Sequence, residues 1–239
     1  LSGKTAEDKI YYRDKDFYVN NNCKTLLGKR AIKIDSNNKN VVLDDNSKIS
    51  YDKLLVATGS RPFVPNIEGY DKVTNKFTFL KYDDAKALEK VINHESKVLI
   101  IGAGLIGLKC AEGLYDKVGS ITVIDLADRV LSSILDVKGS EIMMEHLTNK
   151  GINIILSDSI EKFEENKAYT KSSKTIDFDI CVMAVGVRPN VELLLDVGAK
   201  INKGAVVNDR QETNVQDIYS AGDCCESFDI SLGSNRILA

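Results

Sequence analysis

Short runs of alternating hydrophobic and polar residues fill the first part of the chain. Between residues 24 and 55 the runs AIKID, VVLDD and NSKIS are separated by clusters of Asn, Asp and Ser. Alternation interrupted by such turn residues predicts a small antiparallel meander. The run LLVA then predicts a buried strand that ends at Thr58 and Gly59, and the prolines of SRPFVP predict an irregular connection beyond it.

The hydrophobic spacing changes in the middle of the chain, where strand-like and helix-like segments follow one another. Apolar residues recur at three- and four-residue steps in DDAKALEKVIN, LIGLKCAEGLYDK and SEIMMEHLTNK, which predicts three helices. Continuous apolar runs predict buried strands at residues 97–102, 120–126, 152–157 and 177–187, and a charged hairpin is expected over 161–174. Strands that alternate with helices are typical of a parallel, right-handed βαβαβ unit, so we expect an α/β fold.

The pattern Gly102-x-Gly104-x-x-Gly107 stands between a predicted strand and a predicted helix. In that context the first glycine permits a tight turn, the second lets the backbone approach a pyrophosphate, and the third lets the helix pack against the strand. Leu105 and Ile106 complete the pattern, and free N–H groups at the start of the helix can bind phosphate oxygens. We expect these residues to bind a dinucleotide. The alternative is a glycine turn required for packing alone.

An acidic residue at the end of the next predicted strand supports the dinucleotide interpretation. Asp125 lies 23 residues after Gly102, where a carboxylate accepts hydrogen bonds from an adenosine ribose and repels a 2′-phosphate. This favours NAD(H) over NADP(H). Two alternatives stay open: Asp125 caps a loop, or the nearby Arg129 pairs with the phosphate of NADP(H).

Composition and charge narrow the class of protein. Hydrophobic residues make up 43% of the chain and charged residues 28%, and 32 basic and 35 acidic residues give a net charge of −3. This balance offers no electrostatic case for nucleic acid or a membrane as partner, and the apolar runs are too short to span a bilayer. The sequence has no signal-peptide pattern, and five cysteines without CxxC spacing indicate a reducing cytoplasm. We therefore expect a cytoplasmic protein.

Few side chains suggest direct participation in chemistry. No group of His, Cys, Asp and Glu has metal-ligand spacing, so no metal site is predicted. Cys110 and Cys181 lie in apolar runs typical of buried cysteines, and a redox role for the adjacent pair Cys224–Cys225 is the less favoured interpretation. His94 and His146 are expected to be structural or surface residues. No catalytic side chain is predicted.

Four motifs, DKLLVATGSRP, IIGAGLIG, CVMAVGVRPN and IYSAGD, occur in this order across nearly the whole chain. In their order and spacing the chain resembles the FAD-dependent pyridine nucleotide–disulfide oxidoreductase family. The resemblance implies a Rossmann-like NAD-binding domain, with a parallel sheet, inserted into an FAD-binding domain that contains the β-meander. We expect an FAD-domain portion at 1–85, the inserted NAD domain at 86–202, and the return to the FAD domain at 203–239.

The resemblance also implies which residues contact the cofactors. Ala57-Thr58-Gly59 matches the turn near FAD, and Gly222-Asp223 matches the site where an aspartate holds the ribityl hydroxyls, for which a carboxylate is a strong acceptor. A helix-capping aspartate is the alternative there. Ala31 matches the position whose main chain meets the adenine of FAD, Gly186 matches the backbone near the nicotinamide, and Lys81 stands where the family often has an arginine near FAD.

The sequence departs from the family at three places. The N-terminal glycine fingerprint for FAD is absent, and the chain ends soon after Asp223, before the flavin-contacting helix and interface domain of the family. The expectation is the middle part of a longer protein. Lys109 stands where the family commonly has a glutamate directed toward the flavin. The alternatives for Lys109 are a changed charge beside the nicotinamide and a surface lysine on an amphipathic helix.

The activity implied by the resemblance is hydride transfer from NAD(P)H to the flavin N5, for which the protein aligns two rings and excludes water. Within the family the chain looks most similar to the rubredoxin, ferredoxin and nitrite-reductase-type members, which pass electrons to a small iron–sulfur carrier. NADH oxidase or disulfide reductase activity and a non-catalytic NAD-binding module are the alternatives. The resemblance leaves the electron acceptor and a homodimer open.

Overall fold

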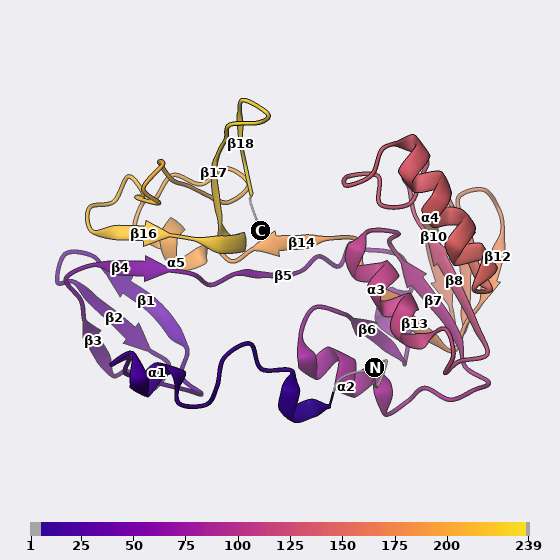
Figure 1. Cartoon of the computed structure of the whole chain (residues 1–239), viewed down its shortest axis with the longest axis horizontal. Coiled ribbons are helices and arrows are strands. Elements are labelled where there is room, and N and C mark those ends of the chain that lie inside the picture. Colours follow the sequence, from indigo (N-terminus) through magenta and orange to yellow (C-terminus); the bar gives the residue numbers. More distant parts are fainter. Residues whose placement is uncertain (1–5, 238–239) are drawn as a thin grey trace. The chain divides into compact units, whose positions relative to one another are not determined.

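The computed structural model describes residues 6–237 and divides into two compact units (Figure 1). Pro62–Val187 form the central unit, and 7–61 together with 188–237 form the flanking unit. Apart from Ala6, which also groups with the central unit, that unit is continuous in sequence, whereas the flanking unit is assembled from the segments before and after it.

The central unit is built on a five-stranded sheet in which every pairing is parallel. Its strands, in spatial order, are β6 (Lys76–Thr78), β13 (Ile180–Met183), β7 (Lys97–Ile101), β8 (Ser120–Ile124) and β9 (Ile152–Ile155). Because parallel strands are buried on both faces, they read as continuous apolar runs. The predicted α/β fold with a parallel sheet is confirmed.

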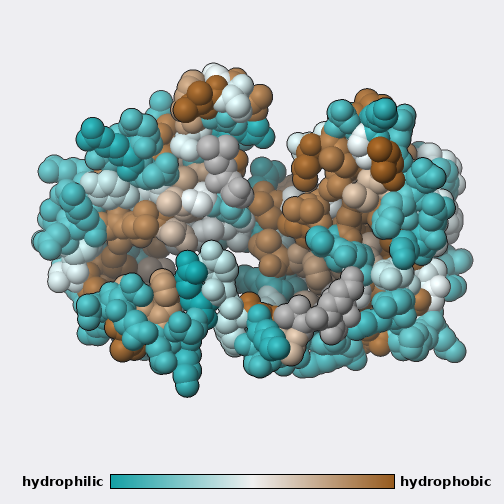
Figure 2. Space-filling view, in the orientation of Figure 1, coloured by the Kyte–Doolittle hydropathy of each residue, from teal (hydrophilic) through white to brown (hydrophobic). Residues whose placement is uncertain are grey.

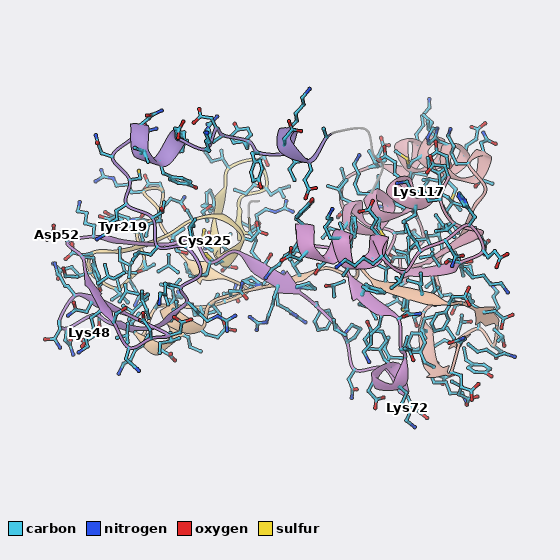
Figure 3. The ribbon with its side chains drawn as sticks, turned by 90° about the horizontal axis from the view of Figure 1, so that it is seen from below. Lys48, Asp52, Lys72, Lys117, Tyr219 and Cys225 are labelled. Atoms are coloured by element: carbon cyan, nitrogen blue, oxygen red, sulfur yellow. The ribbon has the colours of Figure 1, made fainter. Side chains whose placement is uncertain are left out.

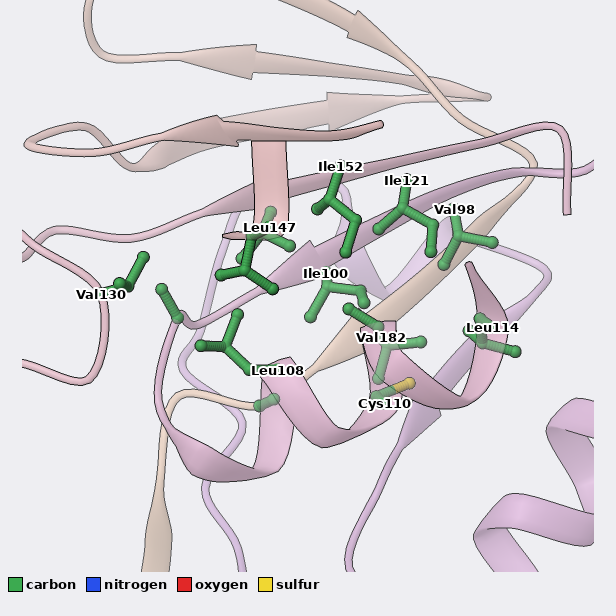
Figure 4. Packing of buried hydrophobic residues seen from close by; sticks show 14 of the residues in the cluster. Val98, Ile100, Leu108, Cys110, Leu114, Ile121, Val130, Leu147, Ile152 and Val182 are labelled. Carbon is green, nitrogen blue, oxygen red and sulfur yellow. The ribbon is translucent and has the colours of Figure 1, made fainter. Parts of the chain in front are cut away.

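One face of this sheet is covered by helices (Figure 4). The α-helices of the central unit are α2 (Tyr82–Glu89), α3 (Leu105–Leu114) and α4 (Val137–Asn149). Leu108, Cys110 and Leu114 of α3 pack in one cluster with Val98 and Ile100 of β7. At the start of α4 the Asp136 carboxylate accepts a hydrogen bond from the Gly139 N–H, which satisfies a donor that the helix leaves free.

The opposite face is covered by a three-stranded antiparallel sheet. Its strands are β10 (Ile160–Glu164), β11 (Lys167–Thr170) and β12 (Thr175–Asp177), where the sequence predicts a hairpin. Phe163 and Phe178 pack in a second cluster with Leu99 and Ile101 of β7. Alternate residues of one strand therefore serve two cores, as the two-residue period of a strand requires.

The flanking unit contains the predicted antiparallel meander. It comprises β1 (Ala31–Asp35), β2 (Asn40–Leu43) and β3 (Lys48–Ser50), paired in that order. β4 (Leu54–Val56) pairs in parallel with β16 (Ile218–Ser220), although the two strands come from opposite ends of the chain. The remaining elements of this unit are η1 (Glu7–Lys9), α1 (Phe17–Asn20), α5 (Glu192–Asp196), β15 (Ala205–Val206), η3 (Gly222–Cys224), β17 (Cys225–Asp229) and β18 (Ser234–Arg236).

The bounds of the compact units differ from the predicted domain boundaries at both ends. Residues 62–85 belong to the central unit, because β6 completes the parallel sheet beside β13 and η2 (Tyr70–Lys72) packs near β10. Residues 188–202 belong to the flanking unit, because Leu194 of α5 is buried in one cluster with Ile34 and Val56. The chain passes between the units in β5 (Ser60–Pro62) and β14 (Val187–Pro189), which pair with each other.

The surface of the central unit is partly hydrophobic. Leu105 beside the glycine turn is exposed, as are Ile134, Val137 and Ile142 around the start of α4, and hydrophobic residues are visible on the face of this unit seen in Figure 2. Among residues 6–237, no helix combines the length and the apolar character needed to cross a membrane. Within the same range, no group of three or more His, Cys, Asp or Glu side chains is placed to hold a metal ion.

Candidate functional site

The three glycines of the turn after β7 serve different purposes. Gly102 has a φ of +114°, and a Cβ there would overlap the Ala184 carbonyl at the end of β13. A Cβ on Gly107 would overlap the Gly102 carbonyl, so this glycine is required for the close packing of α3. A Cβ on Gly104 would meet no atom within 4 Å beyond its immediate neighbours in the chain. The space over Gly104 is therefore open, where the N–H groups that begin α3 can meet an anionic ligand.

Asp125 follows β8 directly, and its carboxylate is bound to the glycine turn. One oxygen accepts a hydrogen bond from the Ala103 N–H, and the other accepts one from the Ala127 N–H at 2.7 Å. The carboxylate thus caps its own loop, as one sequence alternative proposed, and at the same time lies beside the turn. Its contact with a ribose stays a prediction.

Arg129 is held within its own loop. Its guanidinium pairs with Asp128 at 2.9 Å and donates to the Ser132 carbonyl at 3.2 Å. The residue also lines a surface cavity of ≈ 510 Å³ along α4. The buried Nε of the same guanidinium has no hydrogen-bond partner among the described residues, so the alternative in which Arg129 pairs with the phosphate of NADP(H) stays open.

The predicted flavin-side residues of the flanking unit converge at the ends of β4 and β16. Val56 pairs with Ser220, and the Ala221 N–H donates to the Val56 carbonyl, so the turns that follow the two strands start together. Gly222 has a φ of +77°, which turns the chain into η3. The Asp223 carboxylate accepts a hydrogen bond from the Ser60 hydroxyl at 2.8 Å. The structure therefore brings Ala57-Thr58-Gly59 and Gly222-Asp223 together.

Asn190 holds the segment after β4 in place. Its side-chain amide donates to the Thr58 carbonyl at 2.9 Å, while the Thr58 hydroxyl donates to the Asn190 carbonyl at 2.7 Å. The Arg61 guanidinium donates to the Asn190 side-chain oxygen and pairs with Glu192. Ser60 and Asn190 lie inside the TGSRP and VRPN motifs, but their partners are distant in sequence, so sequence reasoning assigned them no role.

The other predicted residues lie in several parts of the fold. Gly186 has a φ of +115° and follows the strand whose end touches Gly102. Ala31 begins β1 opposite Leu43. Lys81 precedes α2 in the central unit, where its N–H donates to Asp84, so its contact with a flavin stays a prediction. Lys109 is largely exposed and pairs with Glu112 at 2.7 Å, which fits the surface-lysine alternative.

The cysteines are unpaired, and most are shielded. Burial raises the pKa of Cys110 and of Cys181 to about 12, as expected for thiols inside a core. Cys225 begins β17 (Figure 3), and its sulfur lies near the Gln211 side chain, whereas the Cys224 sulfur lies near the Ser220 hydroxyl. Both sulfurs are buried and unpaired, and a redox role for the pair stays a sequence-based alternative.

Comparison with known proteins extends this description. The family model described as pyridine nucleotide-disulphide oxidoreductase matches residues 4–237. An NADH oxidase of Methanocaldococcus jannaschii is 35% identical over 98% of this chain and 54% of its own length. The assimilatory nitrate reductase electron transfer subunit of Bacillus subtilis is 34% identical over 95% of this chain and 30% of its own length. The NADH-rubredoxin oxidoreductase of Clostridium acetobutylicum is 32% identical over 92% of this chain and 55% of its own length.

Solved structures agree with these matches. A NAD-dependent persulfide reductase from A. fulgidus is similar with a TM-score of 0.85 and 31% identity, over 95% of this chain and 44% of that one. The covalent putidaredoxin reductase–putidaredoxin complex has a TM-score of 0.92 at 24% identity, over 99% of this chain and 59% of that one, which supports the fold alone. The chain spans about half or less of the length of the curated relatives named above.

Proposed function

Because the chain belongs to the pyridine nucleotide–disulphide oxidoreductase family, we propose that it is part of an FAD-dependent NAD(P)H oxidoreductase that prefers NADH. The reaction is hydride transfer from the nicotinamide to FAD, followed by transfer of electrons to an acceptor. The cofactors supply the redox chemistry when bound, and the protein supplies their binding and orientation.

The observation that carries the proposal is the open space over Gly104 next to a carboxylate that is bound to the same turn. In this proposal the N–H groups at the start of α3 bind the pyrophosphate, and Leu105 and Ile106 lie beside it. Asp125 accepts hydrogen bonds from the adenosine ribose and disfavours a 2′-phosphate. Gly186 lies near the nicotinamide, and its lack of a side chain lets the ring approach the backbone.

The residues of the flanking unit fit a flavin in their donor and acceptor chemistry. Asp223 accepts hydrogen bonds from the ribityl hydroxyls, and Ser60 holds the carboxylate in position through the bond described above. The turn at Thr58 and Gly59 borders the flavin ring of FAD, and the main chain of Ala31 contacts the adenine of FAD. The residues of this chain are thus proposed to form part of the FAD site of a longer protein.

The relatives support an iron–sulfur protein as electron acceptor, since one of them is an NADH-rubredoxin oxidoreductase. In that case electrons leave the flavin singly and no protein thiol is needed. NADH oxidase is the second candidate, favoured by the M. jannaschii relative. The mostly buried cysteines give no support to a disulfide reductase within this part of the protein, and the same unpaired thiols agree with a cytoplasmic location.

An absorbance spectrum tests the proposal. Flavin bands in the purified protein that are bleached by NADH under anaerobic conditions are expected from the enzyme. A colourless protein that still binds NADH would instead be a binding module without turnover. Asp125→Ala should weaken NADH binding and improve NADPH binding, and an unchanged preference between the two would remove Asp125 from the ribose site.

A further inference from the structure

Asp158 is a buried carboxylate to which the proposed chemistry assigns no role. It follows β9, is only 5% exposed, and accepts hydrogen bonds from the Ser159 N–H at 2.8 Å and the Ser172 N–H at 3.2 Å. The Ser172 hydroxyl donates to its second oxygen and also lies 3.1 Å from the Thr170 hydroxyl. Removing a carboxylate from water is costly unless donors surround it, so this set of donors is what permits the charge here.

The main chain around Asp158 is bonded to the loop that carries Asp125. The Asp158 N–H donates to the Asp125 carbonyl at 3.1 Å, and the Ser157 N–H donates to the Ala127 carbonyl at 2.9 Å. In return the Asp125 N–H donates to the Ile155 carbonyl at 2.9 Å. The main chain on both sides of the proposed ribose-binding carboxylate is thus fixed by the segment 155–158.

The conformation of that segment requires support from outside. Ser157 has a φ of +55°, which is unfavourable for a residue with a side chain and persists only where neighbouring contacts impose it. Asp158 supplies such contacts by binding the turn between β11 and β12 through Ser172, and the Lys171 N–H adds a bond to the Ser159 carbonyl at 2.9 Å. Three segments that are separate in sequence therefore meet at Asp158.

We propose that Asp158, through its hydrogen bonds with Ser172, is a positioning residue that sets the loop carrying Asp125 and thereby the preference for the adenosine ribose of NADH. This inference rests on the proposed function, because it takes Asp125 as the ribose-binding residue. Asp158 itself does not touch the dinucleotide. Loss of the Asp158 carboxylate lets the segment 155–158 relax. The Asp125 carboxylate then moves away from the position in which it can accept hydrogen bonds from the hydroxyls of the adenosine ribose.

The test compares Asp158→Asn and Ser172→Ala with Glu161→Gln, which alters an exposed carboxylate on β10. Titration with ADP-ribose, which contains the adenosine ribose but no nicotinamide, measures the effect directly. We expect binding of ADP-ribose to weaken by about tenfold in the first two variants and to stay unchanged in the third. In Asp158→Asn and Ser172→Ala the ratio of NADH affinity to NADPH affinity should fall, while kcat at saturating NADH is retained.

The outcomes separate this inference from the proposed function. If the unaltered chain does not bind ADP-ribose, both are overturned. If it binds and the Asp158 and Ser172 variants bind equally well, or lose thermal stability while keeping the NADH-to-NADPH ratio measured well below their melting temperatures, the positioning role alone is overturned. Ser172→Ala keeps the carboxylate and removes only a hydroxyl, so it covers the case in which Asp158→Asn does not fold.

Discussion

The Ser60 hydroxyl donates a hydrogen bond of 2.8 Å to the Asp223 carboxylate across 163 residues of sequence. This contact follows from the parallel pairing of β4 with β16, in which Val56 lies opposite Ser220. The segments that follow the two strands therefore begin at the same edge of the sheet. The carboxyl ends of parallel strands are where open α/β sheets bind their ligands. Two motifs that are far apart in the sequence therefore contribute to one candidate site.

The first prediction concerns Asp223 and flavin retention. In the full-length protein Asp223→Ala should release FAD, because the ribityl hydroxyls lose their charged acceptor, while Ser60→Ala should weaken FAD binding by a smaller factor, about tenfold, because the carboxylate remains but is less well held. The ratio of flavin to protein absorbance in the purified variants measures both effects. Asp52→Ala, at an exposed position of the same unit (Figure 3), is the control. Full flavin content in Asp223→Ala would contradict the assignment.

The second prediction separates the roles of Gly104 and Gly107 in the glycine turn. Gly104→Val should abolish NADH binding by filling the open space over the turn, and it should change the free energy of unfolding by no more than about 1 kcal/mol. Gly107→Val should instead lower that free energy by about 2 kcal/mol or more, because its side chain overlaps the Gly102 carbonyl. Chemical denaturation and NADH titration distinguish the variants. Normal NADH binding by Gly104→Val would show that the fingerprint is misassigned.

The third prediction is an acid dependence of stability due to Asp158. Hydrogen bonds from Ser172 hold the pKa of Asp158 at about 2, below the value of about 3.9 expected in the unfolded chain. The unfolded chain therefore binds this proton first as the pH falls, so the contribution of Asp158 is complete above about pH 4 and is lost toward pH 2. The free energy of unfolding of Asp158→Asn should fall less steeply over this window than that of the unaltered chain. Parallel curves for the two proteins would contradict the prediction.

The fourth prediction concerns thiol reactivity. All five cysteines lie in the described part of the chain, and Cys23 is the exposed one. An aromatic disulfide reagent should therefore modify one thiol rapidly in the folded protein, because burial keeps the others inaccessible and raises the pKa of Cys110 and Cys181. Cys23→Ser should remove the rapid phase, whereas Cys110→Ser should leave it intact. A rapid phase that survives in Cys23→Ser would point to Cys224 or Cys225.

The elements that could be predicted from the amino-acid sequence are those whose signals are local. The apolar run before Gly102, the spacing of the three glycines and the acidic residue at the end of the next strand predicted the parallel sheet and its turn, because backbone sterics and a two- or 3.6-residue period act over a few neighbouring residues. The meander between residues 24 and 55 was predicted for the same reason, since its turn residues lie between its strands.

The contacts between segments that are distant in the sequence became visible only in the folded chain. The sequence predicted neither the addition of β6 to the sheet nor the packing of α5 in the flanking unit. A strand edge or an apolar helix face can pair with many partners, and the local sequence does not specify which one. The bonds from Ser60 to Asp223, from Asn190 to Thr58 and from Ser172 to Asp158 were hidden for the same reason. A hydrogen bond depends on distance in space, and here the packing of the strands brings its donor and acceptor together.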